Sequence, residues 1–497
     1  MLGRQMKFFL SALALLASLG AAAAPIGYEG ARHLLDRAGF GATDREVREF
    51  AGLDREQAVD RLLAGARREA ATPAPAFVDD PIERPAKLRG DPQARKALQR
   101  KLVREGLELR AWWLREMLDT PSPLTERMTL FWHNHFATSQ RKVRAPQLMY
   151  RQNLLLRREA LGNFATLLHA IAKDPAMLVY LDNARSRRGA PNENFAREVM
   201  ELFTLGMGHY GERDVKEAAR AFTGWSVDPA TGAYRYRPFF HDGGEKVVLG
   251  HRGRLDGDQV IDILLERPET ARFIAAKLWR EFVSPAPDAE EVERWAAVFR
   301  DAHYEMKPLL RAVFLSDAFW APQNRASLVK SPVDLVAGTL RTFDVHPSDL
   351  RPAAVACAVL GQDLFGPPNV KGWPGGDAWI DSATLLGRRQ FVERVFRAGT
   401  GASTVTAAME GDRVRVANAG EPQRPRPGDR LRRLMERGMG DYAFDGRRWE
   451  ESLGTAPREA DIDRLVLASA AVDPVPAGLH PAARARALAA DPAYQLK

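Results

Sequence analysis

A narrow polar stripe on one expected helix is the part of this sequence best suited to chemistry. Four polar residues fall within one arc of about 100° when each residue turns the helix by about 100°, namely Asn194, Arg197, Glu198 and Glu201. Apolar residues occupy the other sides, so we expect a helix buried on several sides whose stripe faces a polar interior rather than bulk solvent. Buried carboxylates acquire shifted pKa values, as general acid–base catalysis requires. The alternative is an ordinary exposed stripe, with Arg197 paired to Glu193 and Glu201 four residues away.

Two histidines separated by one residue form a second motif. His133 and His135 flank an amide within an aromatic run that contains Phe131, Trp132 and Phe136. On a straight helix their side chains point about 200° apart and cannot grip one metal ion, whereas at a helix end that opens into a loop they can converge. Two histidines with this spacing occur in metal sites, but two ligands alone do not make a site. Binding of a divalent metal with further ligands is therefore one of two alternatives for this motif. In the other, one imidazole caps a buried polar pocket beneath the aromatic rings.

Two loops carry further polar residues. One follows an aromatic-rich segment and places His241 beside an aspartate. The other, residues 361–379, holds Lys371 and Trp373 among glycines and prolines. Rigid aromatic loops of this kind suit stacking on sugar rings or contact with a protein partner. The alternative is that the tryptophans cover the core.

These motifs predict a single site, because each supplies what the other lacks. The imidazoles need hydrogen-bond partners and the carboxylate stripe needs donors, so we expect one pocket to collect His133, His135, Asn194 and Glu198. We hypothesise a hydrolase that acts on an extracytoplasmic polymer or glycan. Its acid–base groups would be Glu198 or Glu201, its metal ligands or proton relays the two histidines, and its substrate contacts Asn194, Arg197, His241, Lys371 and Trp373. The competing hypothesis is a non-catalytic assembly or export partner of a secreted enzyme, with the polar helix as a buried structural network.

Helical periodicity dominates the chain around these motifs. We predict helices over 28–40, 93–118, 124–136, 146–159, 163–173, 193–204, 213–223, 257–266, 268–283, 288–302, 306–316, 331–343 and 350–361. Thr43 opens a further helix with a capping-box pattern. In one stretch, residues 234–241 partly alternate, a glycine turn follows, and residues 246–249 return as a second strand. The predicted fold is mainly α, a large multi-helix domain with a small inserted β-hairpin near residues 234–250.

Composition divides the chain into three parts. Residues 1–23 read as a signal peptide, and residues 24–397 as the main helical domain, which includes a Pro-rich connector over 73–92. Residues 398–497 are expected to form a peripheral C-terminal part that packs on the main body. In this part a Gly-, Pro-, Arg- and Ala-rich segment, 399–428, precedes expected helices near 429–438 and 460–470.

The N-terminal segment predicts export. Arg4 and Lys7 precede an apolar run over 8–19, and small residues follow it. This order is typical of a secretory signal peptide, and the run is too short for a transmembrane helix. Cleavage is expected after Ala23, so the protein is predicted to be periplasmic or secreted. The alternative is an uncleaved amphipathic start.

Charge and cysteine content narrow the classes of partner and cofactor. The chain has 497 residues, a formal net charge of +8 and one cysteine, which excludes an internal disulfide framework and multi-cysteine metal sites. That residue, Cys357, lies in an apolar stretch and is expected to be buried and inert. The segment from Arg84 to Arg115 contains ten Lys and Arg residues and only three acidic residues. This basic segment is either a solvated helix face or a binding site for an anionic polymer or glycan. No nucleic-acid-binding motif accompanies the basic segment, so nucleic acid is not an expected partner.

Several segments together resemble a bacterial secreted family known as domain of unknown function 1800. These segments are 131–136, 177–183, 192–198, 222–225, 241–242 and 367–376, and the resemblance runs from about Ala31 to Lys497. It implies a largely helical, exported protein without an assignable activity. It also implies a possible partner, because members are often encoded beside a second exported family, domain of unknown function 1501, which looks like a sulfatase or phosphatase relative. Many members of the family carry His where this chain has Phe203. If that histidine has a role at the site in relatives, this protein does without it.

Overall fold

The structure is a computed structural model that describes residues 24–83, 88, 90–398, 439, 441–454 and 457–497. Within these ranges the protein is mainly α-helical and contains two small two-stranded antiparallel sheets. The predicted fold class is therefore confirmed. The expected signal peptide, the segment 399–428 and the expected helix near 429–438 lie outside the described residues, as do residues 84–87 and 89 of the Pro-rich connector.

The helices of the first half are α1 (Gly27–Ala38), α2 (Asp44–Ala51), α3 (Arg55–Ala64), α4 (Pro92–Asp119), α5 (Pro123–His135), α6 (Gln140–Val143), α7 (Pro146–Arg158), α8 (Phe164–Ala172), α9 (Pro175–Tyr180), α10 (Glu193–Met200) and α11 (Glu212–Ala221). Those of the second half are α12 (Gly257–Glu266), α13 (Pro268–Phe282), α14 (Ala289–Asp301), α15 (Met306–Leu315), α16 (Asp317–Trp320), α17 (Pro332–Thr342), α18 (Arg351–Val359), α19 (Ser382–Ala398), α22 (Gly446–Ser452), α23 (Glu459–Val466) and α24 (Pro481–Ala490). The short turns are η1 (Ala76–Asp79), η3 (Asn183–Arg185), η5 (Pro238–Phe240), η6 (Pro322–Asn324), η7 (Gly376–Trp379) and η9 (Pro492–Gln495), and η4 (Glu201–Leu205) is a π-helix.

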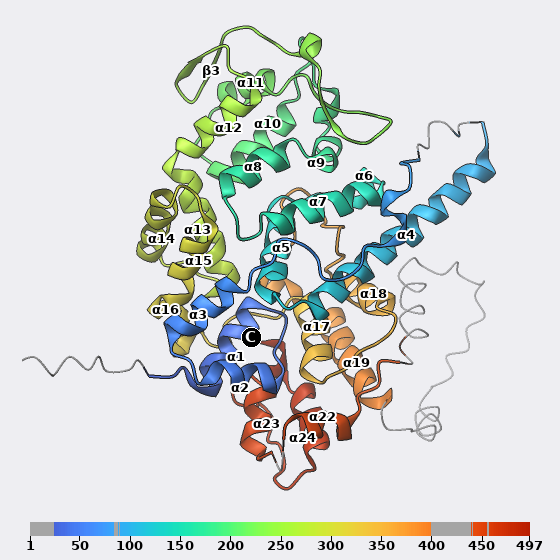
Figure 1. Ribbon diagram of the computed structural model, residues 1–497, viewed down its shortest axis with the longest axis vertical. Coiled ribbons are helices and arrows are strands. Elements are labelled where there is room, and N and C mark those ends of the chain that lie inside the picture. The colour runs from blue at the N-terminus through green and yellow to red at the C-terminus, as the bar shows by residue number, and fades with distance from the viewer. Residues whose placement is uncertain (1–23, 84–87, 89, 399–438, 440, 455–456) are drawn as a thin grey trace, which may run out of the picture.

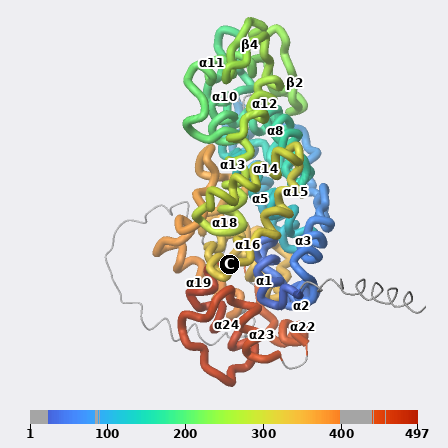
Figure 2. Tube along the Cα trace, turned by 90° about the vertical axis from the view of Figure 1, so that its left-hand side faces the viewer, coloured from blue at the N-terminus to red at the C-terminus, as the bar shows by residue number. Residues whose placement is uncertain are grey.

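The molecule is elongated, and the order of its elements along the long axis is clear in both views. Helices α8 to α12 and the small sheets lie at one end, and α22, α23 and α24 lie at the other (Figure 1). Helix α4 extends sideways from the middle of the body. The view turned by 90° keeps this order and places α1 and α2 close to the C-terminal helices (Figure 2).

Most helix starts follow the capping signals of the sequence. The Thr43 hydroxyl accepts a hydrogen bond from the Glu46 amide at 3.3 Å, and the Glu46 carboxylate accepts one from the Thr43 amide at 2.9 Å, which is the predicted capping box. Proline occupies the first turn of α4, α5, α7, α13 and α17, where its missing N–H would have no helical partner in any case. Helices α3, α9 and α19 were not among the predicted segments.

The β structure differs from the predicted hairpin in its pairing. Strand β2 (Tyr234–Tyr236) pairs with β1 (Trp225–Val227), and β3 (Lys246–Val248) pairs with β4 (His251–Gly253). The predicted pairing of 234–241 with 246–249 is wrong. Pro238 has no N–H to donate and begins the turn η5, so β2 ends before the chain reaches the glycine turn.

Apolar side chains form one continuous core through the described chain, with Trp113 and Trp132 among its largest fully buried members. Cys357 is buried in this core, and its thiol lies 3.9 Å from the Pro332 carbonyl oxygen. Burial raises the pKa of the Cys357 thiol, so the prediction of a buried, inert cysteine is confirmed.

A buried ion cluster lies where α5, α17 and the last residues of the chain meet. Asp334, in the first turn of α17, accepts hydrogen bonds from the Arg127 guanidinium and, at 2.8 Å, from the Lys497 ammonium. The three residues are between 2% and 6% exposed. Arg127 also donates to the Gly39 carbonyl, and its guanidinium carbon lies 4.3 Å from the centre of the Phe40 ring. The cluster therefore links segments that are distant in sequence.

The first helix takes its partners from remote parts of the chain. Arg37 of α1 donates to the carbonyl oxygens of Phe282 at 3.0 Å and Asn324 at 2.6 Å. Arg32, one turn earlier, reaches the carbonyl of Val466 at the end of α23 at 3.4 Å. The N-terminal helix thus completes its polar contacts only in the assembled fold.

The last residues of the chain are buried in the body. Leu496 forms a β-bridge with Val329, and the Trp449 indole N–H donates to the Thr342 carbonyl at 2.8 Å. The described part of 439–497 therefore packs closely on α17 and α19. Among the described helices, none is both long enough and apolar enough to cross a membrane.

Candidate functional site

Helix α10 carries its polar residues at the molecular surface. Asn192 caps the helix, because its side-chain oxygen accepts from the Asn194 amide at 3.0 Å while its amide group donates to the Leu181 carbonyl at 2.6 Å. The buried face consists of Phe195, Ala196, Val199 and Met200. The opposite face leaves Asn194 exposed and Arg197, Glu198 and Glu201 half-buried. The expectation that this stripe faces the interior is therefore wrong, because the helix is covered on one side rather than on several.

The end of α10 widens into the π-helix η4, which the sequence did not predict. Thr204 donates its hydroxyl to the carbonyl oxygens of Val199 at 2.7 Å and Met200 at 3.2 Å. Gly206 then ends the segment with φ +78°, and its amide donates to the Glu201 carbonyl at 3.1 Å. Such π segments are rare and are frequent at functional sites, and this one begins at a predicted catalytic residue.

Two carboxyls of α10 and η4 have different surroundings. The Tyr210 hydroxyl donates a hydrogen bond to Glu201, and burial together with this bond raises the pKa of Tyr210 to about 12, so the phenol remains a donor. Burial, followed by the nearby charge of Glu201, raises the pKa of Glu198, whereas Lys371 and Arg197 act in the opposite direction. We call Arg197, Glu198, Glu201, Tyr210 and Lys371 the carboxylate cluster.

Arg197 has a different partner from either of those expected. Its guanidinium forms two parallel hydrogen bonds with the Glu212 carboxylate, at 2.7 and 2.8 Å. Glu212 starts α11, so this pair fastens α10 to the next helix. The pairing of Arg197 with Glu193 and Glu201 is therefore not formed.

His133 is enclosed by aromatic rings. The ring centres of Trp113, Phe365 and Trp373 lie 5.3, 5.4 and 5.6 Å from that of His133. Its Nε2 has no hydrogen-bond partner within the described chain, and burial, followed by the charge of Arg110, lowers the pKa of His133 to about 3. The imidazole is therefore neutral at physiological pH and has no open path to substrate.

His135 is equally buried, but both of its ring nitrogens are bonded. The Lys277 ammonium lies 2.8 Å from Nδ1, and the carbonyl oxygen of Phe203 lies 3.2 Å from Nε2. An ammonium can only donate, so Nδ1 accepts and Nε2 carries the proton that the Phe203 carbonyl accepts. Burial, followed by the charge of Lys277, lowers the pKa of His135 well below its usual value, and burial lowers the pKa of Lys277 to about 8.

The loop 367–376 is locked onto the end of α5. The side-chain oxygen of Asn134 accepts from the Trp373 amide at 2.7 Å, and Gly372, at φ +81°, packs directly against Asn134. Trp373 is only 4% exposed, and Trp379 is also buried. Both rings therefore cover the core, which is the second of the two alternatives considered for this loop. The same loop carries the exposed Lys371 into electrostatic reach of Glu198. The histidine motif, the loop and the carboxylate helix thus meet, with the histidines beneath the surface and the carboxyls on it.

Replacing Gly372 tests this lock. A β-carbon at this position would lie 2.1 Å from the Asn134 side-chain oxygen and 2.5 Å from its backbone oxygen, so Gly372→Ala must displace the loop. We expect the free energy of unfolding to fall by about 3 kcal/mol, which combines left-handed backbone strain with overpacking. Gly375→Ala is the matched control, because Gly375 has φ +73° but open space around it, and should cost only about 1–2 kcal/mol. Equal losses in urea titrations of the two variants would show that the loop does not depend on this contact.

His241 belongs to a separate network at the sheet end of the molecule. Its Nδ1 lies 3.0 Å from the Thr223 carbonyl oxygen, which fixes it beside Asp242. The Arg220 guanidinium donates to Asp242 at 2.8 and 3.2 Å and lowers the pKa of that carboxyl to about 2. In the described chain His241 contacts Thr223 and Tyr236, neither of which belongs to the carboxylate cluster, so its role as a substrate contact stays a prediction.

The described residues hold no group of three or more His, Cys, Asp or Glu side chains arranged to bind a metal ion. Two cavities of about 790 and 460 Å³ are lined by residues other than the predicted site residues. Neither imidazole is hydrogen-bonded to a carboxylate in the described chain; His135 has taken a lysine and a carbonyl instead. A shared pocket for His133, His135, Asn194 and Glu198 stays a prediction.

Two residues of this region were missed from the sequence. Tyr210 lies in a glycine-rich loop nine positions after Glu201. A tyrosine so close in sequence to a predicted catalytic carboxylate indicates a possible hydrogen-bond donor to it. Lys277 is a lone cation on the apolar side of α13, three residues after the buried Ile274 and next to the buried Leu278. A charge on such a face predicts a buried partner, although not which one.

Comparison with known proteins places these features in a family. The matching family model carries the description "Protein of unknown function (DUF1800)" and covers residues 33–496. Searches of curated proteins and of solved structures found no match to this chain. Phe203, where many members were expected to have His, is buried with its ring centre 6.3 Å from that of His135. With the match spanning nearly its whole length, the chain belongs to the DUF1800 family.

Proposed function

We propose that the protein is an exported hydrolase that cleaves a glycan or related polymer at the carboxylate cluster. Glu198 would act as the general acid and Glu201 as the ionised partner that activates water or stabilises positive charge. The observation that carries this proposal is the contrast between two neighbouring carboxyls. Burial and Glu201 raise the pKa of Glu198, while Glu201 accepts a hydrogen bond from the Tyr210 hydroxyl that orients its carboxylate.

The position of the carboxyls supports a polymer as substrate. They lie at the surface with the exposed Lys371 in electrostatic reach, so a long chain can pass over them and have an anionic group bound by this cation. Export rests on the N-terminal pattern of residues 1–23. In this proposal both histidines support the site from beneath. His133 packs against Trp373 of the loop that carries Lys371, which Asn134 also holds, and His135 bonds the Phe203 carbonyl of η4.

Glu198→Gln tests the assignment of the acid. The amide has nearly the same size and cannot supply a proton, so the hydrolysis rate should fall by about 10²–10⁴-fold. Glu193→Gln, on the exposed first turn of α10, should leave the rate unchanged.

The measurement is the release of reducing ends from soluble peptidoglycan fragments and from acidic polysaccharides. The wild-type rate should fall as the pH rises above the raised pKa of Glu198, because the general acid then loses its proton. Equal rates for the two variants would refute the role of Glu198.

A second candidate function is non-catalytic binding of a co-encoded exported protein of the kind known as domain of unknown function 1501. The observation that favours it is the exposure of large apolar side chains in and after strand β2, with Phe239 86% and Tyr236 43% exposed. Phe239→Ser should then abolish co-purification of the two proteins, whereas Glu198→Gln should not affect it. Retained co-purification of the Phe239 variant would remove this candidate.

A further inference from the structure

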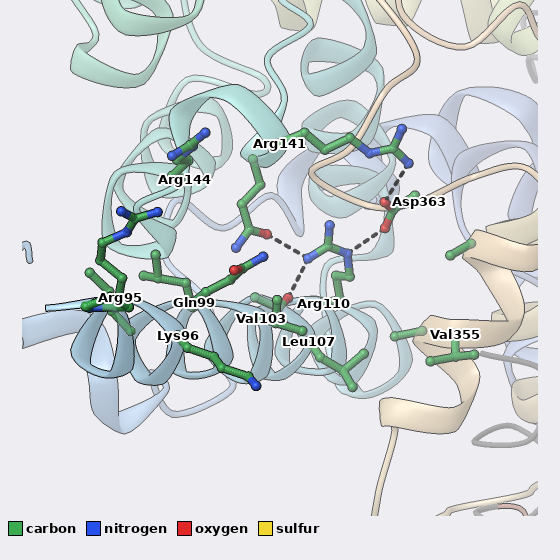
Figure 3. A pocket seen from close by; sticks show the side chains of 17 residues that line it. Arg95, Lys96, Gln99, Val103, Leu107, Arg110, Arg141, Arg144, Val355 and Asp363 are labelled. Atoms are coloured by element: carbon green, nitrogen blue, oxygen red, sulfur yellow. Dashed lines mark hydrogen bonds and ion pairs between the residues drawn. The ribbon is translucent and has the colours of Figure 1, made fainter. Parts of the chain in front are cut away.

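A groove along α4 lies apart from the carboxylate cluster. It is bounded by the first two-thirds of α4, by α6 with its following residue Arg144, and by α18, and it has a volume of about 790 Å³ (Figure 3). Cavities of this size are typical of small-molecule sites. The sequence analysis identified the basic character of this segment but could not show that it faces a cavity.

One end of the groove is cationic and lacks counter-ions. The side chains of Arg95, Lys96 and Arg144 line it, and none of them forms an ion pair within the described chain. Arg141 reaches the Asp363 carboxylate only at 3.5 Å. Figure 3 shows Arg95 and Arg144 on facing sides of this end, with Gln99 close by. An anion placed between them would meet guanidinium groups from two separate elements.

The remainder of the groove is apolar, and its far end is electrically neutralised. Leu102, Leu107 and Val355 line it together with Val103, which is 68% exposed. Arg110 closes this end, but its guanidinium is already bonded to Asp363 at 2.6 Å and, at 2.7 Å, to the side chain of Gln140 and the carbonyl of Gly106. Polarity therefore changes along the groove from free cations to hydrocarbon.

The walls of the groove are fixed by close packing. A β-carbon on Gly106 would lie 2.2 Å from Nε2 of Gln140, so α6 rests directly on the backbone of α4. Arg144 follows α6 with φ +66°, a conformation that a non-glycine residue adopts at a cost and that the surrounding structure must enforce. The backbone of α6 and Arg144 is thus fixed relative to α4 at this groove.

We infer that this groove binds a single-chain anionic amphiphile, such as a long-chain carboxylate, as a monomer. The head group lies between Arg95 and Arg144, and the hydrocarbon chain runs past Val103 and Leu107 toward Val355. The axial distance from Arg95 to Arg110 is about 22 Å, which accommodates an extended chain. A polyanion would need free cations along the whole groove, whereas the change from cationic to apolar lining matches a ligand with one charged end.

The test is calorimetric titration of the full chain with laurate and myristate below their micelle concentrations. Each buried methylene contributes about 0.8 kcal/mol, so the two extra methylenes of myristate should tighten binding about 15-fold. Dodecanol, which has the chain without the charge, should bind at least tenfold more weakly than laurate. Equal affinity for laurate and myristate, or for laurate and dodecanol, would overturn the proposal. Binding only to phosphatidylglycerol vesicles would also overturn it and would indicate a membrane surface instead.

Variants localise the binding. The double variant Arg95→Gln/Arg144→Gln should weaken laurate binding at least tenfold, and Val103→Asp should weaken it by a similar factor through charge repulsion. Arg104→Gln is the matched control, because Arg104 is an exposed cation on the same helix that does not line the groove. All of these side chains are exposed, so unchanged circular dichroism should accompany each substitution. Equal affinities of the double variant and Arg104→Gln would exclude this groove as the site.

Discussion

Asp334→Ala is expected to lower the free energy of unfolding by about 3–5 kcal/mol, because it leaves two buried cations without their counter-ion. Arg127 and Lys497 are both within the core and both donate to this carboxylate. The substitution also removes the acceptor for the Ser331 amide at the start of α17. A loss of this size is a large fraction of the stability of an ordinary domain. Urea titration followed by tryptophan fluorescence measures it.

A surface pair provides the control for Asp334→Ala. Glu451 is bonded to Arg447 at 3.0 Å, but their side chains are 66% and 90% exposed, so Glu451→Ala should cost at most about 1 kcal/mol. Asp334→Asn separates charge from shape, because it keeps an acceptor for the two cations but lacks the negative charge. If Asp334→Ala and Glu451→Ala shifted the urea midpoint equally, the cluster would have no special energetic role.

Acid is expected to destabilise the protein between pH 6 and pH 4, by about 1.4 kcal/mol per pH unit for each histidine that stays neutral in the folded chain. Burial lowers the pKa of His33 and His133 to about 3, and that of His135 well below its usual value. The unfolded chain binds protons at these histidines near pH 6.5 while the folded chain does not. The stability is therefore complete above pH 6.5 and is lost as the pH falls toward 3, by about 1.4 kcal/mol per group and pH unit.

Carboxyls with raised pKa values, Asp174, Glu198 and Glu105, act against this trend. Burial raises the pKa of Asp174 to about 7, so the folded chain keeps a proton there that the unfolded chain has released, which offsets about one histidine. Unfolding titrations at a series of pH values give the slope directly. His133→Phe should reduce the slope by about 1.4 kcal/mol per pH unit, whereas His209→Phe, the same change at an exposed position, should not. A wild-type slope near zero would mean that the imidazoles become protonated without unfolding.

Local signals in the sequence were sufficient for most of the helices. Thr43 with Glu46, and prolines such as Pro123 and Pro332, fix helix starts through contacts within a few residues. The pairing of the strands could not be predicted from such local signals, because β2 has two possible partner strands, β1 and β3, that are both close to it in sequence. Pro238 ends the strand before it can reach β3, because proline has no N–H to continue the ladder.

The candidate site was predictable in its composition more than in its arrangement. Periodicity placed Glu198 and Glu201 on one face, but it could not tell whether neighbouring elements cover that face. The partners of His135 come from α13 and η4, whose approach depends on packing across more than a hundred residues. The contact between Asn134 and Gly372 likewise joins motifs that the sequence presents separately.

Some residues that contact α1 are synthesised long after α1 itself, so these contacts form only after a delay. Arg32 pairs with a carbonyl at residue 466, and a ribosome that adds about 5–20 residues per second needs roughly 20–90 s to proceed from one to the other. During that interval the contacts of α1 with α13 and α23 have not formed, although α1 can already pack on α2. The packing of α1 is therefore completed far later than that of the upper helices α10, α11 and α12, whose contacts are close in sequence.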